Sequence, residues 1–183
     1  TKGVWTAKRH NWQAPATLRR QYNLREREIE SEVVPAALDA GLGLLPWSPL
    51  AGGWLTGKYR RESVPAGKTR VGDNPARQFQ GWDLRSNNEH TWQIIDALKA
   101  IADAHRASSA QVALAWLAAQ PGVTSVILGA RTVEQLTDNL GAAALRLTAA
   151  EEKQLTELSR PAVGNYPYGA DGRNQRSRQL PPA

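Results

Sequence analysis

The chain of 183 residues has no cysteine and no methionine. Without cysteine it forms no disulfide framework and no thiolate site, which fits a reducing compartment, and we expect a cytoplasmic protein. No apolar run approaches the ~18 residues of a membrane-spanning helix, so we expect no membrane partner. The sequence begins at Thr1 without a methionine or a signal peptide. We expect a fragment, or a chain with a missing start, that carries no targeting address.

Acidic residues are scarce at the two ends of the chain, and this scarcity accounts for the net charge of +6. Residues 1–30 hold seven Lys or Arg against three Glu, and residues 160–183 hold four Arg against one Asp. Residues 31–159 are balanced, with twelve basic and thirteen acidic side chains. Nucleic-acid-binding proteins usually concentrate cations on one structured face, so we interpret the excess as solvated basic termini and expect no nucleic-acid partner.

The apolar residues, 41% of the chain, predict an alternation of short strands and helices. Continuous apolar or β-branched runs predict strands within 16–24, 41–48 and 123–130. Helical spacing and capping residues predict helices over 1–10, 27–41, 91–105, 108–122, 132–145 and 147–159.

Two of these helices carry a distinct apolar face. The face predicted within 27–41 consists of Ile29, Val33, Ala36, Ala37 and Ala40, with Pro35 expected to kink or divide the helix. The face predicted within 91–105 consists of Trp92, Ile95, Leu98, Ile101 and Ala102. The helix over 108–122 is apolar nearly all round and is therefore expected to be buried.

Alternating strands and helices are typical of parallel βαβ units, so we expect an α/β fold. A closed (β/α)8 barrel needs eight strands and about 250 residues, whereas only three strands are predicted here. An open sheet of three strands leaves its edges and inner face without partners. We therefore expect one partial domain over residues 1–183, self-association through unpaired strand edges, and an irregular basic tail over 160–183.

Glycine-containing turns follow two of the predicted strands, at 47–53 (Trp-Ser-Pro-Leu-Ala-Gly-Gly) and at 128–132 (Leu-Gly-Ala-Arg-Thr). Ligands of α/β folds bind at the carboxyl ends of strands, and small residues let the backbone approach an anion. Arg131 adds a planar guanidinium suited to phosphate, and Lys58 adds a point charge. These features indicate a ligand that bears phosphate.

The same turns also have a purely structural interpretation. Glycine-containing turns after strands are common in proteins that bind nothing there. In this interpretation Trp47 belongs to the core, while Thr132 and Gln135 form a helix cap. The residues alone leave both interpretations open.

Two longer stretches carry a resemblance to a known family. The segments "QYNLREREIESEVVPAALDAGLGLLPWSPLAGGWLTGKY" and "SVILGARTVEQLTDNLGA" look like the carboxyl-terminal half of an aldo/keto reductase. More narrowly, they resemble the bacterial and potassium-channel β-subunit branch. The resemblance extends from about Trp5 to Tyr168. It implies a (β/α)8 TIM barrel, of which this chain covers about the last three βα units plus a carboxyl-terminal helix and tail.

The resemblance also implies an NADP(H) site. It places Trp47 on the nicotinamide ring and Arg131, which follows Gly129, at the 2′-phosphate of adenosine. Residues of the first turn that would line or close over the pyrophosphate are Ser48, Leu50, Ala51, Gly52 and Lys58, with Arg70 beyond them. Residues that would bind the adenosine portion are Gln135, Asp138 and Asn139. Because Gln135 lies four residues after Arg131 and three to four residues before Asp138 and Asn139, we expect them to share one helix face.

The sequence departs from the family pattern where the chemistry takes place. Arg19 stands where the family usually has a glutamine that contacts the nicotinamide carboxamide, and Arg20 stands where proline is frequent. The family's catalytic Asp, Tyr, Lys and His have no counterpart here, and we interpret His10, His90 and His105 as structural or surface residues. We therefore assign no catalytic residue and no metal ligand.

Two functions remain open. The first is the NADP(H)-binding half of a carbonyl reductase, whose complete form transfers hydride between NADPH and an aldehyde or ketone. This chain alone is then expected to be inactive. The alternative is a truncated or degenerate module that binds a nucleotide or a partner protein without turnover.

Overall fold

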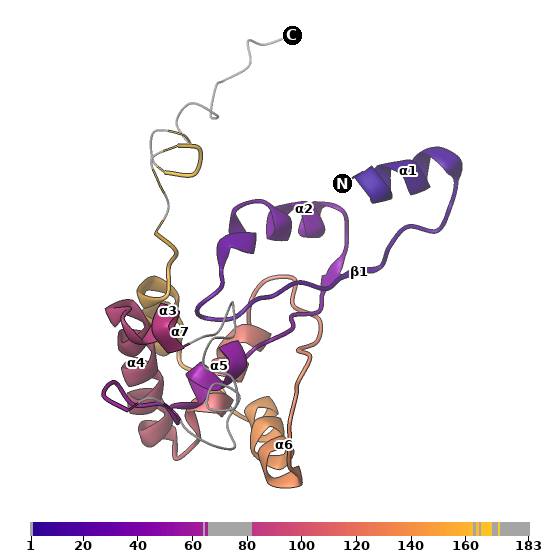
Figure 1. Cartoon of the computed structure of the whole chain (residues 1–183). Helices are drawn as coiled ribbons and strands as arrows, with labels where there is room; N and C mark the ends of the chain where they lie inside the picture. The colour runs from indigo at the N-terminus through magenta and orange to yellow at the C-terminus, as the bar shows by residue number, and fades with distance from the viewer. Residues whose placement is uncertain are drawn as a thin grey trace.

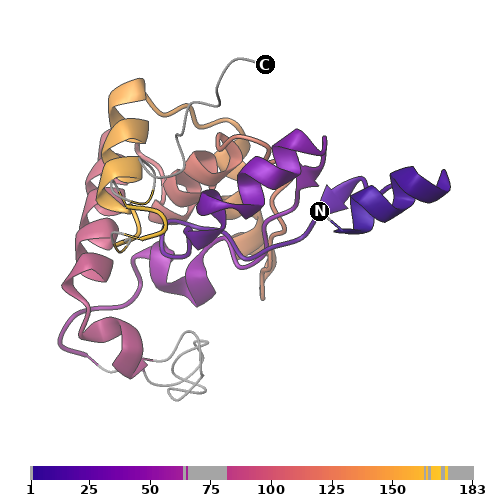
Figure 2. The ribbon, with the colours of Figure 1, turned by 90° about the horizontal axis from the view of Figure 1, so that it is seen from above.

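The computed structural model describes residues 2–63, 65, 82–162, 164, 166–169 and 172 of the chain. It is a mixed structure of helices and short strands. The α-helices are α1 Lys2–His10, α2 Val33–Asp39, α3 Trp82–Ser86, α4 Glu89–His105, α5 Ser109–Ala118, α6 Val133–Leu140 and α7 Ala149–Leu158. The 3-10 helices are η1 Glu28–Ser31, η2 Ala51–Thr56 and η3 Gly141–Ala143, and the strands are β1 Thr17–Leu18 and β2 Gly43–Leu44. In Figures 1 and 2, α1 projects away from the body that the other helices form.

The strands β1 and β2 pair in parallel, as the sequence predicted, with Thr17 opposite Gly43 and Leu18 opposite Leu44. The pairing continues as an isolated parallel bridge between Gln21 and Trp47. The parallel direction confirms a βαβ arrangement in which α2 connects the two strands. It also brings the residues that follow each strand to the same edge of the sheet.

The strand predicted over 123–130 is wrong, since only Val123 forms a bridge, to Leu44. The backbone still runs beside β2, because Thr124 N donates to Leu44 O at 3.0 Å and Ile127 N donates to Pro46 O at 2.9 Å. Successive hydrogen bonds are therefore three residues apart in the 123–130 segment but two residues apart in the segment that begins with β2. This mismatch is of the kind found in β-bulges. Pro46 has no N–H to donate, so a regular ladder cannot continue past it.

The helix predicted over 27–41 is also wrong in its extent and in its apolar face. It consists of η1 and α2, separated at Glu32, whose φ of −141° is not helical. Pro35 lies in the first turn of α2, where its missing N–H removes no intrahelical bond. The buried residues of α2 are Val34 and Ala37, whereas Ala36 is exposed.

The hydrophobic core lies between α4, α5, η2 and α7. All members of the predicted stripe on α4 are buried: Trp92, Ile95, Leu98, Ile101 and Ala102. Helix α5 is buried nearly all round, as its composition predicted. Helix α7 begins with the predicted capping box, in which Thr148 Oγ1 accepts from Glu151 N at 3.3 Å. No helix within the described ranges is long and apolar enough to cross a membrane.

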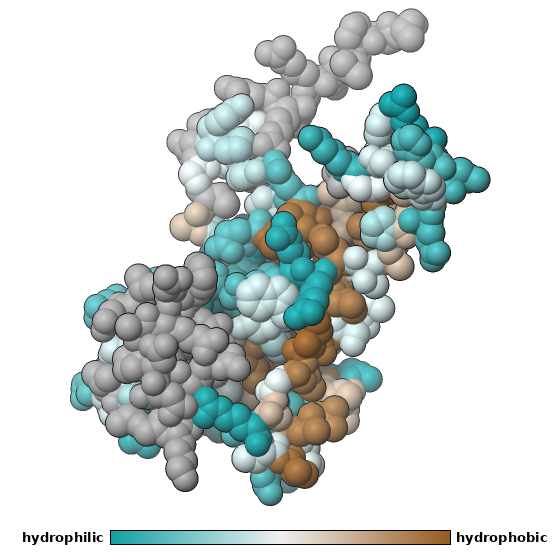
Figure 3. All heavy atoms as spheres, turned by 45° about the vertical axis from the view of Figure 1, so that its right-hand side comes forward, coloured by the Kyte–Doolittle hydropathy of each residue, from teal (hydrophilic) through white to brown (hydrophobic). Residues whose placement is uncertain are grey.

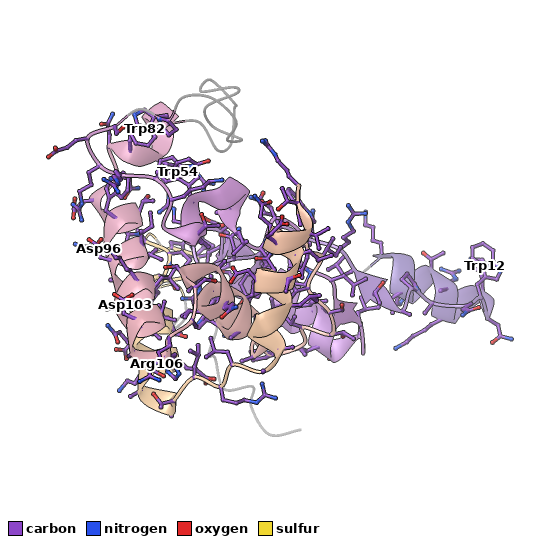
Figure 4. All side chains as sticks on the ribbon, turned by 90° about the horizontal axis from the view of Figure 1, so that it is seen from below. Trp12, Trp54, Trp82, Asp96, Asp103 and Arg106 are labelled. Atoms are coloured by element: carbon purple, nitrogen blue, oxygen red, sulfur yellow. The ribbon has the colours of Figure 1, made fainter. Side chains whose placement is uncertain are left out.

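Several large apolar side chains are exposed, most of them on helices and none on the strands β1 and β2. Figure 3 shows apolar residues gathered in a band down the middle of one face. Over the described residues, the exposed large apolar side chains are Trp5, Trp12, Leu38, Trp47, Val133, Leu136, Leu140 and Tyr166. Figure 4 shows Trp12 at the far end of α1. The self-association that such exposure favours remains a prediction.

Candidate functional site

A cavity of about 670 Å³ lies between the turn after β2 and the segment that leads into α6. The residues that line it are Trp47, Ser48, Pro49, Leu50, Gly52, Gly53, Thr56, Lys58, Ser108, Ala110, Ile127, Leu128, Gly129, Ala130, Arg131, Gln135, Asp138 and Asn139. The structure therefore brings together all the predicted binding residues except Ala51 and Arg70. Ala51 is fully buried in the core beneath the turn, and Arg70 lies outside the described residues.

The first wall begins at Trp47, where the chain leaves the sheet. Trp47 N donates to Arg20 O at 2.9 Å, which fixes the backbone, while the residue as a whole is 38% exposed. Trp47 is therefore not a core residue, and its ring is accessible from the cavity. The turn that follows Trp47 is anchored to the interior, because the buried side chain of Asn23 donates to Ser48 O at 2.9 Å.

The turn itself has an unusual backbone. Positive φ angles occur at Ser48 (56°), Ala51 (49°), Gly52 (71°) and Gly53 (97°). The φ of 97° at Gly53 favours glycine there, and a Cβ atom built on it would lie 2.7 Å from Lys58 Nζ, so a larger residue would also push the lysine side chain away. Lys58 thus folds back over the glycines, and its charge stays at the cavity wall.

Buried aromatic rings hold this turn in place. Trp54, in η2, is fully buried and stacks on Trp82 of α3, with ring centroids 5.4 Å apart. Trp92 of α4 contacts Trp54 edge-on at 5.8 Å. Figure 4 shows Trp54 and Trp82 together at the end of the molecule where η2 meets α3. Since such rings bury large apolar areas, the position of the glycine turn is set by the core.

The second wall is the turn before α6. Thr132 is the N-cap, and its hydroxyl accepts from Gln135 N at 3.3 Å. The reciprocal half of a capping box is absent, because Gln135 Oε1 accepts from Arg131 N at 3.0 Å instead. The cap therefore uses the backbone N–H of Arg131. The cap and the ligand interpretations of this turn are compatible.

The surroundings of this cap favour anion approach only in part. No atom of the described residues lies within 4 Å of a Cβ built on Gly129, so within that part of the chain the backbone there is open. At Glu134, in the first turn of α6, a backbone N–H and the Thr132 hydroxyl hold the pKa of the carboxyl below its usual range. Glu134 is therefore ionised near neutral pH, and it places a negative charge in the first turn of α6, three residues after Arg131.

The far end of α6 is tied to the amino end of α5. Asp138 Oδ2 accepts from Ser108 Oγ at 2.8 Å, and Asp138 Oδ1 accepts from Gln111 Nε2 at 3.0 Å. Asn139, next to Asp138, is only 7% exposed and also lines the cavity. The S-x-x-Q spacing of Ser108 and Gln111 signals a helix cap, but nothing local in the sequence indicates their contact with Asp138, some thirty residues away.

The histidines and the unexpected arginines lie outside this cavity. His90 Nε2 hydrogen-bonds with Leu158 O, and His105 Nε2 lies 2.9 Å from a Glu151 carboxylate oxygen. Neither these two nor His10 or Arg19 is among the lining residues. Among the described residues, no group of His, Cys, Asp and Glu is arranged to hold a metal ion.

Comparison with known proteins gives one consistent result. The sequence profile described as "Aldo/keto reductase family" matches residues 2–160. The chain is 39% identical to the "Probable voltage-gated potassium channel subunit beta" of Oryza sativa subsp. japonica over 141 residues. The aligned region covers 76% of this chain and 42% of that protein. It is 34% identical over 161 residues to the "Uncharacterized oxidoreductase YrpG" of Bacillus subtilis (strain 168), covering 88% and 45%.

A fungal enzyme is similar over the same region. The "Versiconal hemiacetal acetate reductase" of Aspergillus parasiticus is 30% identical over 149 residues, which cover 81% of this chain and 41% of that enzyme. The chain thus spans somewhat less than half the length of the curated relatives it matches.

Proposed function

Because the chain belongs to the aldo/keto reductase family, we propose that it forms the NADP(H)-binding half of an oxidoreductase. In the complete protein, hydride would pass between NADPH and an aldehyde or ketone. The observation that carries the proposal is the cavity itself, which is lined by the accessible Trp47, by a glycine turn with positive φ angles and by Arg131. Its volume of about 670 Å³ lies in the usual range for small-molecule and cofactor sites.

The residues present fit a dinucleotide phosphate. The flat ring of Trp47 would stack on the nicotinamide, which supplies the hydride when bound. The backbone from Ser48 to Gly53 would approach the pyrophosphate, and Lys58, folded over Gly53, would neutralise part of its charge. The second wall supplies the matching adenosine end.

At that second wall, Arg131 would grip the 2′-phosphate, because a guanidinium forms two parallel bonds to phosphate oxygens. Gln135 and Asn139 line the same side of the cavity and would contact the adenosine. Asp138 lies among them with its carboxylate already bonded to α5. The positive end of the α6 dipole adds to the attraction for an anion.

We further propose that the chain is a partial (β/α)8 barrel, a single domain without turnover of its own. No tyrosine or histidine is among the cavity-lining residues that the structure describes, so no side chain of the usual acid type faces the nicotinamide end. The same observation favours the second candidate function, a nucleotide-binding module without catalysis. Cytoplasmic location remains a prediction from the absence of cysteine.

Titration of the purified chain tests the binding proposal. NADP⁺ and NAD⁺ are added in separate calorimetric titrations at low and at moderate salt, and NADP⁺ is expected to bind more tightly. A chain that binds neither nucleotide refutes the proposal. Turnover is tested separately, by following NADPH oxidation with an aldehyde present. Carbonyl-dependent oxidation above the rate without protein would contradict the claim that this chain is inactive alone.

A further inference from the structure

Helix α6 is held to the body of the protein at its carboxyl end. Residues 131–137 are all exposed, Asp138 is half-buried, and Asn139 is the buried residue of the helix. The amino end, which carries the Arg131 turn, is therefore positioned by whatever fixes Asp138 and Asn139. The attachment of the last turn of α6 therefore determines where the Arg131 wall of the cavity lies.

The attachment is a closed hydrogen-bond network with the amino end of α5. Ser108 Oγ accepts from Gln111 N at 3.1 Å and donates to Asp138 Oδ2 at 2.8 Å. Gln111 Nε2 donates both to Asp138 O at 2.8 Å and to Asp138 Oδ1 at 3.0 Å. Both carboxylate oxygens are thereby engaged, and the negative charge lies at the positive end of the α5 dipole. Because α5 is packed in the core, these hydrogen bonds fix the carboxyl end of α6 relative to the core.

The residue that follows α6 also shows how closely the two helices approach. A Cβ atom built on Gly141, directly after α6, would lie 2.5 Å from Gln111 Nε2. No real Cβ tolerates that distance, so a side chain at position 141 would displace Gln111 or α6. Glycine at 141 and glutamine at 111 therefore belong to the same contact.

We propose that Ser108 and Gln111 are positioning residues for the nucleotide site, acting through Asp138 to aim α6 at the adenosine end of the cavity. Asp138, which lines the cavity, links these two residues to the site. The inference rests on the proposed function and adds to it the residues that set affinity for the adenosine 2′-phosphate. None of these three residues is a catalytic residue.

The geometry gives the size of the effect. In α6 the amino end, Val133, lies five residues before Asp138, or about 7.5 Å at 1.5 Å per residue, so a tilt of about 10° around Asp138 moves that end by roughly 1.3 Å. Charge-assisted hydrogen bonds require donor–acceptor distances within about 0.5 Å of 2.8 Å. Loss of the network is therefore enough to separate Arg131 from a bound phosphate.

The experiment compares Ser108→Ala and Gln111→Ala with the conservative Ser108→Thr, which keeps the hydroxyl. Thr148→Ala is the matched control, because it removes the hydroxyl of a capping box on α7, away from the cavity-lining residues. Affinities for NADP⁺ and for adenosine 2′,5′-bisphosphate are measured by calorimetry. Amide hydrogen exchange over α6 is measured without ligand.

Ser108→Ala and Gln111→Ala are expected to weaken both ligands about three- to tenfold and to speed exchange over α6. Ser108→Thr is expected to restore both properties, and Thr148→Ala to change neither. A loss of affinity equal to that of Thr148→Ala, or unchanged exchange over α6, overturns the inference. Failure of the wild-type chain to bind NADP⁺ refutes the proposed function instead, and hydrogen exchange still tests the contact between α5 and α6.

Discussion

Replacement of Arg131 by alanine should weaken NADP(H) binding and leave NAD(H) binding nearly unchanged. The 2′-phosphate of NADP(H) carries close to two negative charges near neutral pH, and a ribose hydroxyl offers a guanidinium no comparable partner. Hydrogen bonds to charged groups contribute about 1.5–3 kcal/mol each, which corresponds to roughly a ten- to hundredfold change in affinity. Because Arg131 is exposed, a value near tenfold is expected.

The start of helix α6 does not depend on the side chain that this substitution removes. The cap of α6 uses the backbone N–H of Arg131, the hydroxyl of Thr132 and the amide oxygen of Gln135. All three groups survive Arg131→Ala, so the helix start is retained and a loss of affinity reports the guanidinium. Arg146→Ala is the matched control, since Arg146 is also exposed but bonds to the backbone carbonyls of Ala143 and Leu145.

The assay is a titration of NADP⁺ and NAD⁺ against wild type and both variants at two ionic strengths. The NADP⁺ preference should shrink with added salt, because screening weakens the contact between Arg131 and the phosphate. Equal losses for the two cofactors, or no loss for either, would remove Arg131 from the site. An equal effect of Arg146→Ala would assign the change to overall charge.

Three further outcomes are expected. Glu134→Gln should strengthen NADP⁺ binding about two- to threefold, because it removes an ionised carboxyl from the first turn of α6. The control Glu152→Gln on α7 should leave the affinity unchanged, and equal effects of the two variants in calorimetry would contradict the prediction. Arg27→Leu should lower the free energy of unfolding, measured in urea, by about 1–3 kcal/mol, because it removes a buried guanidinium that donates to Glu30, Thr156 O and Ser159 Oγ. Arg61→Leu, in an exposed pair, should lower it by about 0–1 kcal/mol, and similar losses would refute the distinction. Light scattering should show concentration-dependent association of the chain, and a monodisperse monomer that binds no hydrophobic dye would refute it.

The helices were predictable where their signals are local. The stripe on α4 and the capping box at Thr148 both depend on residues three or four positions apart, and the structure confirms them. The helix over 27–41 failed because its break is at Glu32, a residue with no strong helix-breaking tendency, while the obvious breaker Pro35 fits the first turn. The strand over 123–130 failed because the limit comes from Pro46 in the neighbouring segment.

The site was predictable in a different way. That Trp47 and Arg131 would line one cavity followed from the resemblance, since nothing in the spacing alone joins two turns so far apart in the chain. The structure places both at the cavity. Ser108 was not foreseen, because its hydrogen bond to Asp138 depends on how α5 and α6 pack and not on local sequence.

The two walls of the cavity are fixed by different kinds of interaction, and this difference bears on how the site would tolerate change. The glycine turn rests on Trp54, which is fully buried among aromatic rings, so moving it requires disrupting the core. The Arg131 turn depends on an exposed helix held at one end by the hydrogen bonds of Asp138. If the cavity binds a dinucleotide as proposed, substitutions at this wall should alter the proposed adenosine end, and with it the preference for NADP(H) over NAD(H), at little cost in stability. The nicotinamide end should change only together with the fold.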